Sequence, residues 1–328
     1  MDIFDADMDK HWRVAVVVCP QHSLASVALV LDAFRMTSQL PGGRRFEVLR
    51  VSEDGAAVAH PDGLLSIDAG PEALSGVDVV VVPSLWTEGE AAVASSPQLV
   101  QALGQLPEQV LLAAFCTGVY LVAAAGRLNQ RRATTHWMLA EGFARRYPQV
   151  QVDASLNLTH DGNVVCTGGS LAAIDGCLHV VQQLAGREFA KDLARMLVTD
   201  LQRGPQARFM APAGSRRHRD REVRTLQKHL EEHHADAVSL QALSERVHMT
   251  VRTMQRRFVA ATGLTPMAYL QSVRIEASKD LLSQERLPVA EVAARVGYQD
   301  RVAFGRSFKK LTGMTPAAYR QQQGVSNQ

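Results

Sequence analysis

The chain has 328 residues, enough for two domains of ordinary size, and its 46% hydrophobic and 21% charged residues are typical of a globular protein. No apolar run approaches the ~20 residues that a membrane span needs, and the polar N-terminus lacks a signal-peptide core, so the sequence predicts a cytoplasmic protein outside the membrane. The net charge of +2 is unevenly distributed, because residues 216–328 carry 19 Lys and Arg against 11 Asp and Glu, whereas residues 1–215 are acidic. A basic C-terminal part indicates a polyanionic partner, although a solvated charged surface would explain the same split.

The first part of the chain alternates apolar runs with amphipathic segments. Runs typical of strands that are buried on both faces lie at 14–19, 77–83 and 110–115. Segments that predict helices lie at 24–38, 90–103 and 118–125. This alternation predicts an open, mostly parallel α/β sheet, and such sheets bind ligands at the carboxyl ends of their strands.

One predicted strand runs directly into a sharp turn at Cys116-Thr117-Gly118, which a helix follows. A cysteine on a strand-to-helix turn has the geometry of a nucleophile elbow. A purely structural interpretation is also open, because small residues suit a tight turn and cysteine often serves as a small buried apolar side chain.

A second strand-to-helix turn runs from Cys166 to Ser170 and contains two glycines. Glycines permit close backbone approach, and the N-terminus of the next helix attracts a carboxylate or another anion, although a plain glycine-rich turn fits these residues equally well. From the two turns, and a histidine between them in the sequence, we predict a site for a small-molecule effector. The predicted residues of this site are Cys116, Thr117, His136, Thr167, Gly168, Gly169 and Ser170.

Three stretches of this part carry a more specific pattern: AAFCTGVYLVAAAGRL (113–128), RRATTHW (131–137) and DGNVVCTGGSLAAIDGCLHVV (161–181). They resemble the class I glutamine amidotransferase-like superfamily, in its PfpI-type protease branch, and more closely the sensor domain of GlxA-like regulators. The resemblance implies a flavodoxin-like open parallel sheet that senses a ligand and forms dimers. In enzymes of this superfamily the elbow cysteine is often followed by histidine and supported by a glutamate of the first helix. This chain has Thr117 and Asp32 there, so we expect no catalytic residues, and a thiol-dependent amidase or protease-like enzyme with a DNA-binding module is the alternative.

Amphipathic spacing stops at 203–220, where Gly, Pro and a basic cluster replace it, and we interpret this stretch as a linker. The predicted domains are a ligand-sensing and dimerisation domain at 1–202 and a DNA-binding domain at 221–322, with a disordered tail at 323–328. The cysteines show no CxxC pairing, and no HExxH, Walker A or strand-linked GxGxxG motif is present, so we expect no metal site and no cofactor.

The C-terminal part contains a near-repeat, in which RRFVAATGLTPMAYLQ (256–271) matches RSFKKLTGMTPAAYRQ (306–321) at an offset of 50 residues. Before each copy a short helical segment and a tight turn lead into the repeated helix, and the second turn is one residue longer. Two helices joined by such a turn are a helix-turn-helix, so the repeat indicates two of these units, which a long helix at 265–283 is predicted to hold apart. The predicted capping residues of these helices are Ser239, Thr250, Gly263, Asp300 and Gly313.

The second helix of each unit carries side chains that can read bases. Arg pairs with guanine and Gln with adenine in the major groove, whereas Lys contacts phosphates without reading sequence. For any single Arg a solvated helix face is the simpler interpretation, but Arg256 and Arg306 stand at equivalent positions of two tandem units, which favours DNA binding. The residues predicted to bind DNA are Arg252, Thr253, Gln255, Arg256, Arg301, Val302, Gly305, Arg306, Lys309 and Lys310, and of the basic side chains Lys309, Lys310 and Arg257 are better placed for phosphates.

Residues 221–322 as a whole resemble the AraC/XylS-type DNA-binding domain, and GYQDRVAFGRSFKKLTGMTPAAYR (297–320) resembles the signature of that family. The resemblance implies that the Arg and Gln side chains face bases. Val302, which is also an apolar-face candidate, is expected to meet a thymine methyl group or nothing. The resemblance further implies a sequence-specific transcriptional regulator, an activator, that binds promoter DNA as a homodimer and contacts RNA polymerase. The spacing of His229 and His233 could hold zinc, but no further ligands stand nearby, and an exposed helix face is the better interpretation.

Overall fold

The computed structural model describes residues 11–41, 46–85, 89–201, 203–209, 218–284 and 287–322. The chain divides into two compact units, Met1–Gln206 and Ala207–Gln328. The first unit extends past the predicted boundary at 202, because the side chains of Arg203 and Gln206 are hydrogen-bonded to it. The predicted tail at 323–328 and the middle of the predicted linker, 210–217, lie outside the described residues.

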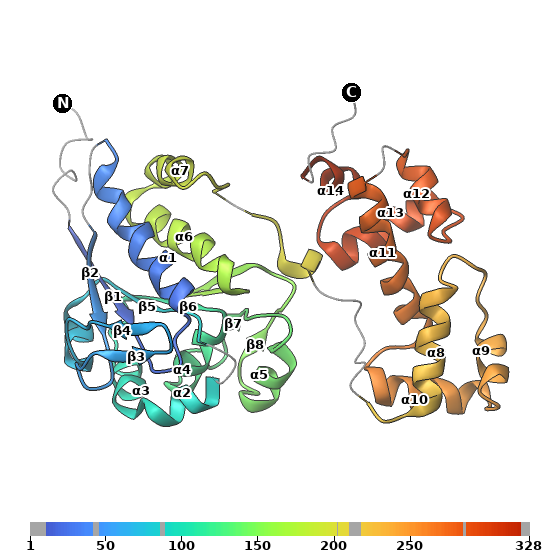
Figure 1. Cartoon of the computed structure of the whole chain (residues 1–328), viewed down its shortest axis with the longest axis horizontal. Coiled ribbons are helices and arrows are strands. Elements are labelled where there is room, and N and C mark those ends of the chain that lie inside the picture. The colour runs from blue at the N-terminus through green and yellow to red at the C-terminus, as the bar shows by residue number, and fades with distance from the viewer. Residues whose placement is uncertain are drawn as a thin grey trace. The chain divides into compact units, whose positions relative to one another are not determined.

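The first unit is built on an open sheet with the strand order β2-β1-β5-β6-β10-β9. Neighbouring strands are parallel, except that β9 runs antiparallel to β10, so the predicted mostly parallel α/β sheet is confirmed (Figure 1). The strands are β1 Trp12–Val17, β2 Phe46–Val51, β5 Val79–Val82, β6 Leu111–Phe115, β9 Leu158–Asp161 and β10 Val164–Thr167.

Both faces of this sheet are buried, which is why its central strands are continuous apolar runs. In β5, Val79 and Val81 belong to one core and Val80 and Val82 to the other, because successive side chains of a strand point to opposite faces. Helices α1, α6 and α7 cover the first face, and α2, α3 and α4 cover the second (Figure 1). The six helices are α1 Leu24–Arg35, α2 Gly89–Ser95, α3 Pro97–Gly104, α4 Val119–Ala124, α6 Ala173–Ala185 and α7 Arg187–Met196.

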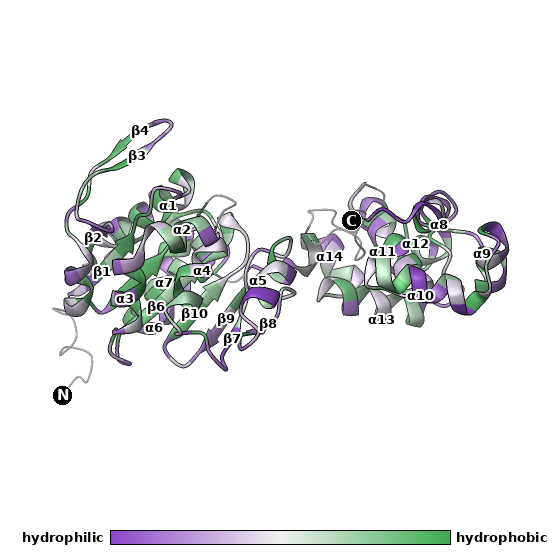
Figure 2. Cartoon of the chain, turned by 90° about the horizontal axis from the view of Figure 1, so that it is seen from below, coloured by the Kyte–Doolittle hydropathy of each residue, from purple (hydrophilic) through white to green (hydrophobic). Residues whose placement is uncertain are grey.

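The predicted helix at 90–103 is two helices in the structure, α2 and α3. Ser96 lies between them, immediately before Pro97, and the residue before a proline is disfavoured in the helical conformation. Pro97 itself begins α3, where its missing N–H costs nothing. The first unit also contains a β-hairpin that extends from its body in Figure 2, a second short pair of strands, and one more helix. These are β3 Val58–His60 with β4 Gly63–Leu65, β7 Arg132–Ala133 with β8 Gln151–Val152, and α5 Ala140–Arg146.

The described residues of the second unit form helices only, and two separate cores hold them together. The long helix α11 belongs to both, because its Tyr269 and Leu270 pack with α8, α9 and α10 while its Ile275 and Leu282 pack with α12, α13 and α14. The predicted helix that holds the two helix-turn-helix units apart is thereby confirmed. The helices are α8 Arg221–Glu232, α9 Leu240–Arg246, α10 Val251–Thr262, α11 Pro266–Gln284, α12 Val289–Arg295, α13 Arg301–Thr312 and α14 Pro316–Gln322. None of the helices over the described stretches is both long and apolar enough to cross a membrane.

The predicted helix caps are in place in this unit. The side chains of Ser239, Thr250 and Asp300 accept hydrogen bonds from the first turns of α9, α10 and α13. Gly263 and Gly313 end α10 and α13 in the left-handed conformation, at φ values of 76° and 78°. Four residues, 247–250, separate α9 from α10, and five residues, 296–300, separate α12 from α13, so the predicted longer second turn is confirmed.

Candidate DNA interface and effector site

The two repeated helices bury the same face. In α10 the side chains of Met254 and Phe258 are at most 1% exposed, and their equivalents in α13, Phe304 and Phe308, are fully buried. The pattern of buried and exposed positions is the same along both helices from their second residue onward. The two helices therefore present equivalent outer faces, as the repeat in the sequence predicts.

The residues predicted to contact DNA lie on these outer faces, with one exception. Val302, which the sequence also allowed on the apolar face, is 64% exposed. Thr253 is partly covered, because its hydroxyl accepts a hydrogen bond of 3.0 Å from the capping Thr250. Gly305 lies on an open surface, where a Cβ atom would meet nothing within 4 Å. The exposed side chains are Arg252, Arg256, Arg301, Val302, Arg306, Lys309 and Lys310, and the partly exposed residues are Thr253, Gln255 and Gly305.

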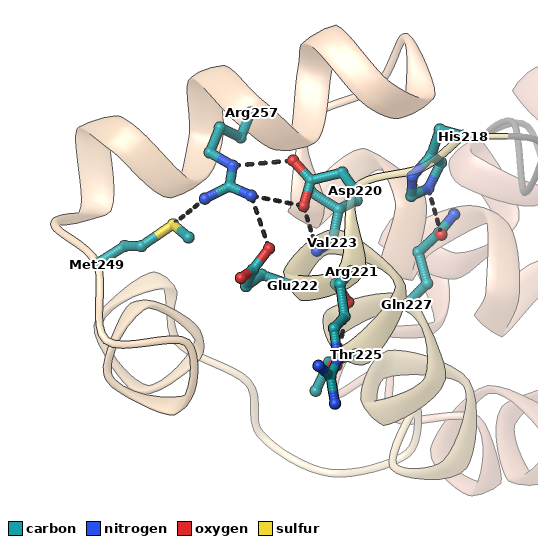
Figure 3. A network of polar contacts seen from close by, with 9 residues as sticks. All are labelled: His218, Asp220, Arg221, Glu222, Val223, Thr225, Gln227, Met249 and Arg257. Atoms are coloured by element: carbon teal, nitrogen blue, oxygen red, sulfur yellow. Dashed lines mark hydrogen bonds and ion pairs between the residues drawn. The ribbon is translucent and has the colours of Figure 1, made fainter.

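The exception is Arg257, which the sequence predicted as a phosphate contact (Figure 3). Its guanidinium donates to both carboxylate oxygens of Asp220, each at 2.8 Å, and to Glu222 at 2.7 Å. A third nitrogen lies 3.6 Å from the sulfur of Met249. In this structure two carboxylates of its own chain occupy donors that would meet a phosphate, so the predicted contact of Arg257 would require this ion pair to open.

Asp220 has two functions at once, since its carboxylate also accepts the backbone N–H of Val223 at 3.1 Å and so caps α8. Hydrogen bonds from Arg257 hold the pKa of Asp220 below its usual range. The network ties α10, the second helix of the first helix-turn-helix, to the start of α8. In the second helix-turn-helix the position equivalent to Arg257 is Ser307, which cannot form such an ion pair.

In the first unit of the chain, the two predicted turns stand at the carboxyl ends of neighbouring strands, β6 and β10. Cys116 has a φ of 53°, a value that residues other than glycine seldom adopt, and its side chain is 4% exposed. Gly118 packs against β5 so tightly that a Cβ atom would lie 2.6 Å from the carbonyl oxygen of Pro83. The sharp strand-to-helix turn with an elbow cysteine is therefore present.

A chain of hydroxyl groups connects the two turns across the end of β5. The backbone N–H of Leu85 donates to Thr117 Oγ1 at 2.8 Å, and the Thr117 hydroxyl lies 3.4 Å from that of Ser84. Ser84 in turn lies 3.4 Å from the hydroxyl of Ser170. The structure thus brings together Thr117 and Ser170, which are far apart in the sequence, and adds Ser84, which the sequence analysis missed. A serine directly after a predicted strand was the available signal.

The other predicted residues surround the second turn. A Cβ atom on Gly169 would lie 3.4 Å from the imidazole of His136, so the histidine sits against this glycine. Burial lowers the pKa of His136, which favours a neutral ring, and its Nδ1 accepts the backbone N–H of Met138 at 3.2 Å. Thr167 is fully buried at the end of β10, and its hydroxyl has no hydrogen-bond partner among the described residues.

The support for a catalytic thiol differs from the enzymatic pattern. Asp32, which aligns with the supporting glutamate, is exposed on α1. Ser26 of the same helix is 2% exposed, and its Oγ accepts the backbone N–H of Ser84 at 3.0 Å. Near the carboxyl ends of the strands, α1 therefore contributes the hydroxyl of Ser26, which has a structural role, and not the carboxylate of Asp32.

Other sites that the sequence raised are accounted for. Within the described ranges no three His, Cys, Asp or Glu side chains are grouped so that they could hold a metal ion. The rings of His229 and His233 lie 4.6 Å apart on α8 and form no larger group. A hollow of roughly 460 Å³ lies beside α3 and the residues that precede β5 and β6, at the opposite ends of the strands from the two turns, and Gln98, Gln101 and Gln105 contribute to its wall.

Comparison with known proteins finds relatives of this chain. A helix-turn-helix domain family matches residues 243–322, the region of both repeated units. The regulator GbdR of Pseudomonas aeruginosa is 25% identical over 315 residues, which are 94% of this chain and 84% of that protein. The regulator GlxA of Rhizobium meliloti is 22% identical over 320 residues, 95% of this chain and 96% of that protein. Both are named as helix-turn-helix transcriptional regulators. The chain is a DNA-binding transcriptional regulator whose residues 243–322 form a helix-turn-helix domain.

The fold of the first unit has a solved counterpart. The crystal structure of Drosophila melanogaster DJ-1beta matches with a TM-score of 0.51 and 19% sequence identity, covering 58% of this chain and all of that protein. Such a likeness shows the fold alone. The regulator therefore combines an α/β unit that has the fold of DJ-1beta with a helix-turn-helix domain, so the predicted fold class is confirmed.

Proposed function

We propose that this regulator is an activator that responds to a small metabolite bound in its first unit. The supporting observation is that three hydroxyl groups, two strand-to-helix turns and a neutral histidine gather at the carboxyl ends of three parallel strands. Open α/β sheets bind ligands at this edge. The N-terminus of α6, which follows Ser170, favours a ligand with a carboxylate.

On the DNA side, we propose that α10 and α13 enter successive major grooves and read bases with their outer faces. Both helices expose long donors at equivalent positions, Arg256 and Arg306, and Lys309 and Lys310 are positioned to meet phosphates. A homodimer formed through the first unit would give the operator its symmetry, and an activator would contact RNA polymerase. The proposed setting is the cytoplasm.

We further propose that the first unit senses and does not catalyse. Cys116 is held in a strained turn, but Asp32 is exposed where enzymes place the glutamate that supports the thiol. The competing function is a thiol-dependent amidase. Assays of amide hydrolysis with the wild type and with Cys116→Ala separate the two, because an amidase turns over its substrate only while the thiol is present, whereas a sensor shows no turnover in either protein.

The experiment that tests the sensor is a map of bound genomic sites followed by a thermal-shift screen of carboxylate metabolites that the neighbouring genes process. A true effector raises the melting temperature of the full chain by mass action and changes its affinity for the mapped operator. Ser170→Ala should weaken this binding, whereas Ser95→Ala, a change on α2, should leave it unaltered. A metabolite that stabilises the chain without changing operator affinity would contradict the sensor proposal, because equal affinity for both states shifts nothing.

A further inference from the structure

Gln206, the last residue of the first unit, is locked into the body of that unit although the sequence places it in the linker. Its side chain is 4% exposed, and the two N–H groups of its amide nitrogen are shared among three acceptors: Thr134 Oγ1 at 3.0 Å, the Thr135 carbonyl at 2.7 Å and the Leu156 carbonyl at 3.0 Å. A buried side chain amide with three partners is a rigid anchor, because each lost partner would leave a polar group unsatisfied.

The second predicted turn is shaped around this anchor. A Cβ atom on Gly168 would lie 2.6 Å from Oε1 of Gln206, so only glycine leaves room for the glutamine there. The backbone N–H of Gly168 donates to the Asn157 carbonyl at 2.9 Å, next to the Leu156 that the anchor contacts. The close approach that the sequence assigned to a ligand is made, at Gly168, by the chain's own linker residue.

The turn at Cys116 is connected to Gln206 through one intervening residue, Thr135. Thr135, whose carbonyl accepts from Gln206, donates its hydroxyl to the carbonyl of Cys116 at 2.8 Å, and Thr135 is fully buried. The hydrogen-bond path therefore runs from the Cys116 turn through Thr135 to Gln206. It crosses only two side chains between the proposed effector site and the point where the chain leaves the first unit.

Arg203 makes a second attachment, independent of Gln206. Its Nε donates to the nearly buried carboxylate of Asp175 at 3.0 Å and its Nη2 donates to the carbonyl of Leu171. The Asn157 side chain donates to the same carboxylate at 2.8 Å. Leu171 and Asp175 belong to the helical segments that follow the second turn, so residues 203–206 are hydrogen-bonded to these segments and, through Thr135, to the first turn.

We propose that Arg203 and Gln206 are positioning residues that transmit the state of the two turns to the linker. An effector that moves the Cys116 turn or the Gly168 turn shifts the balance between an attached and a released start of the linker. The proposal rests on the proposed effector site for its physiological meaning. The coupling itself is a property of the chain alone, and by reciprocity it acts in both directions.

Hydrogen exchange of the full-length protein, with no ligand added, tests this coupling. Gln206→Glu replaces the donating amide with a carboxylate that faces two carbonyls, so we expect amide exchange in residues 116–119 and 168–172 to rise by about 2- to 10-fold. Exchange in β5, within the same unit, stays at the wild-type rate. Gln149→Glu makes the same chemical change on an exposed surface and should leave all these segments unaltered.

The reverse experiment starts from the site. Thr135→Val removes the hydroxyl that reaches Cys116 with little change in shape, and we expect exchange in residues 203–209 to rise. If Gln206→Glu does not fold, Gln206→Asn and Arg203→Lys replace it. The coupling is refuted if residues 203–209 loosen in the Gln206 variant while both turns exchange at the wild-type rate, or if the whole unit loosens uniformly. Failure of every ligand screen would contradict the proposed function and leave these exchange results standing.

Discussion

Arg257 and Asp220 form a two-point ion pair in which both carboxylate oxygens are 2.8 Å from guanidinium nitrogens. The pair joins the recognition helix α10 to the residue that caps α8, and Glu222 extends it (Figure 3). One cation of a strongly basic helix is therefore paired within the chain. Two consecutive arginines, Arg256 and Arg257, therefore have opposite environments, one exposed and one paired.

Arg257→Met should lower the affinity for operator DNA by a similar factor at every salt concentration. The reason is that the variant loosens α10 against α8 without removing a phosphate contact, so few counterions are involved. Lys310→Ala should behave differently. It removes one phosphate contact, so the slope of log affinity against log salt concentration should become shallower by about 0.9. Binding titrations over a range of salt concentrations measure both. A slope that falls in Arg257→Met as it does in Lys310→Ala would show that the ion pair opens on DNA.

Arg256→Ala and Arg306→Ala should each weaken specific binding by roughly 1–3 kcal/mol and relax the preference for one base pair. The two helices should read different bases, because Gln255 of α10 is replaced by Gly305 in α13. Affinities for a panel of operator variants, each with one base pair changed, locate the relaxed position. If Arg256→Ala binds the whole panel like the wild type, the proposed placement of the first recognition helix is wrong.

Two glycine substitutions should change stability in opposite directions. In Gly118→Ala the new Cβ would lie 2.6 Å from the Pro83 carbonyl oxygen, so we expect a loss of roughly 1–3 kcal/mol in the unfolding free energy of the first unit. In Gly305→Ala the new methyl meets nothing within 4 Å, and alanine favours a helix by about 0.5–1 kcal/mol, so the second unit should become more stable. Denaturant unfolding of each variant measures both effects. If Gly118→Ala is as stable as the wild type, the backbone at the end of β5 can shift to accommodate the new methyl group.

The first unit should lose stability in mild acid because of His179. Burial, and next the neighbouring His160 at 3.0 Å, lower the pKa of His179 from 6.5 to about 4. Between these values the unfolded chain binds a proton that the folded chain does not. The unfolding free energy therefore falls as the pH drops from 6.5 towards 4, by at most about 1.4 kcal/mol per pH unit for one proton. Denaturation at several pH values should show a shallower dependence in His179→Gln, and an unchanged slope would contradict the assignment to this histidine.

Much of the fold could be read from local patterns. The sequence correctly predicted the helix-capping residues Ser239, Thr250 and Asp300 and the glycines that end α10 and α13. It also correctly predicted that the two repeats form equivalent helices. Each of these features depends on backbone chemistry within a few residues. The apolar runs of β1, β5 and β6 were equally readable, since a strand buried on both faces has few polar alternatives. The break between α2 and α3 was missed although Pro97 signalled it locally.

The sequence by itself determined that two helix-turn-helix units follow an α/β domain with an elbow cysteine, because repeat, periodicity and turn residues are properties of neighbouring residues. Tertiary structure alone decided which polar groups meet. Only the fold brings Arg257 to Asp220, 37 residues away, and so pairs this cation within the chain. Only the fold brings Gln206 against Gly168. The sequence suggested that this glycine leaves space for a ligand, but in the structure the side chain of Gln206, at the start of the linker, fills that space. Hydrogen bonds between distant segments depend on how the layers pack, and no local pattern records that packing.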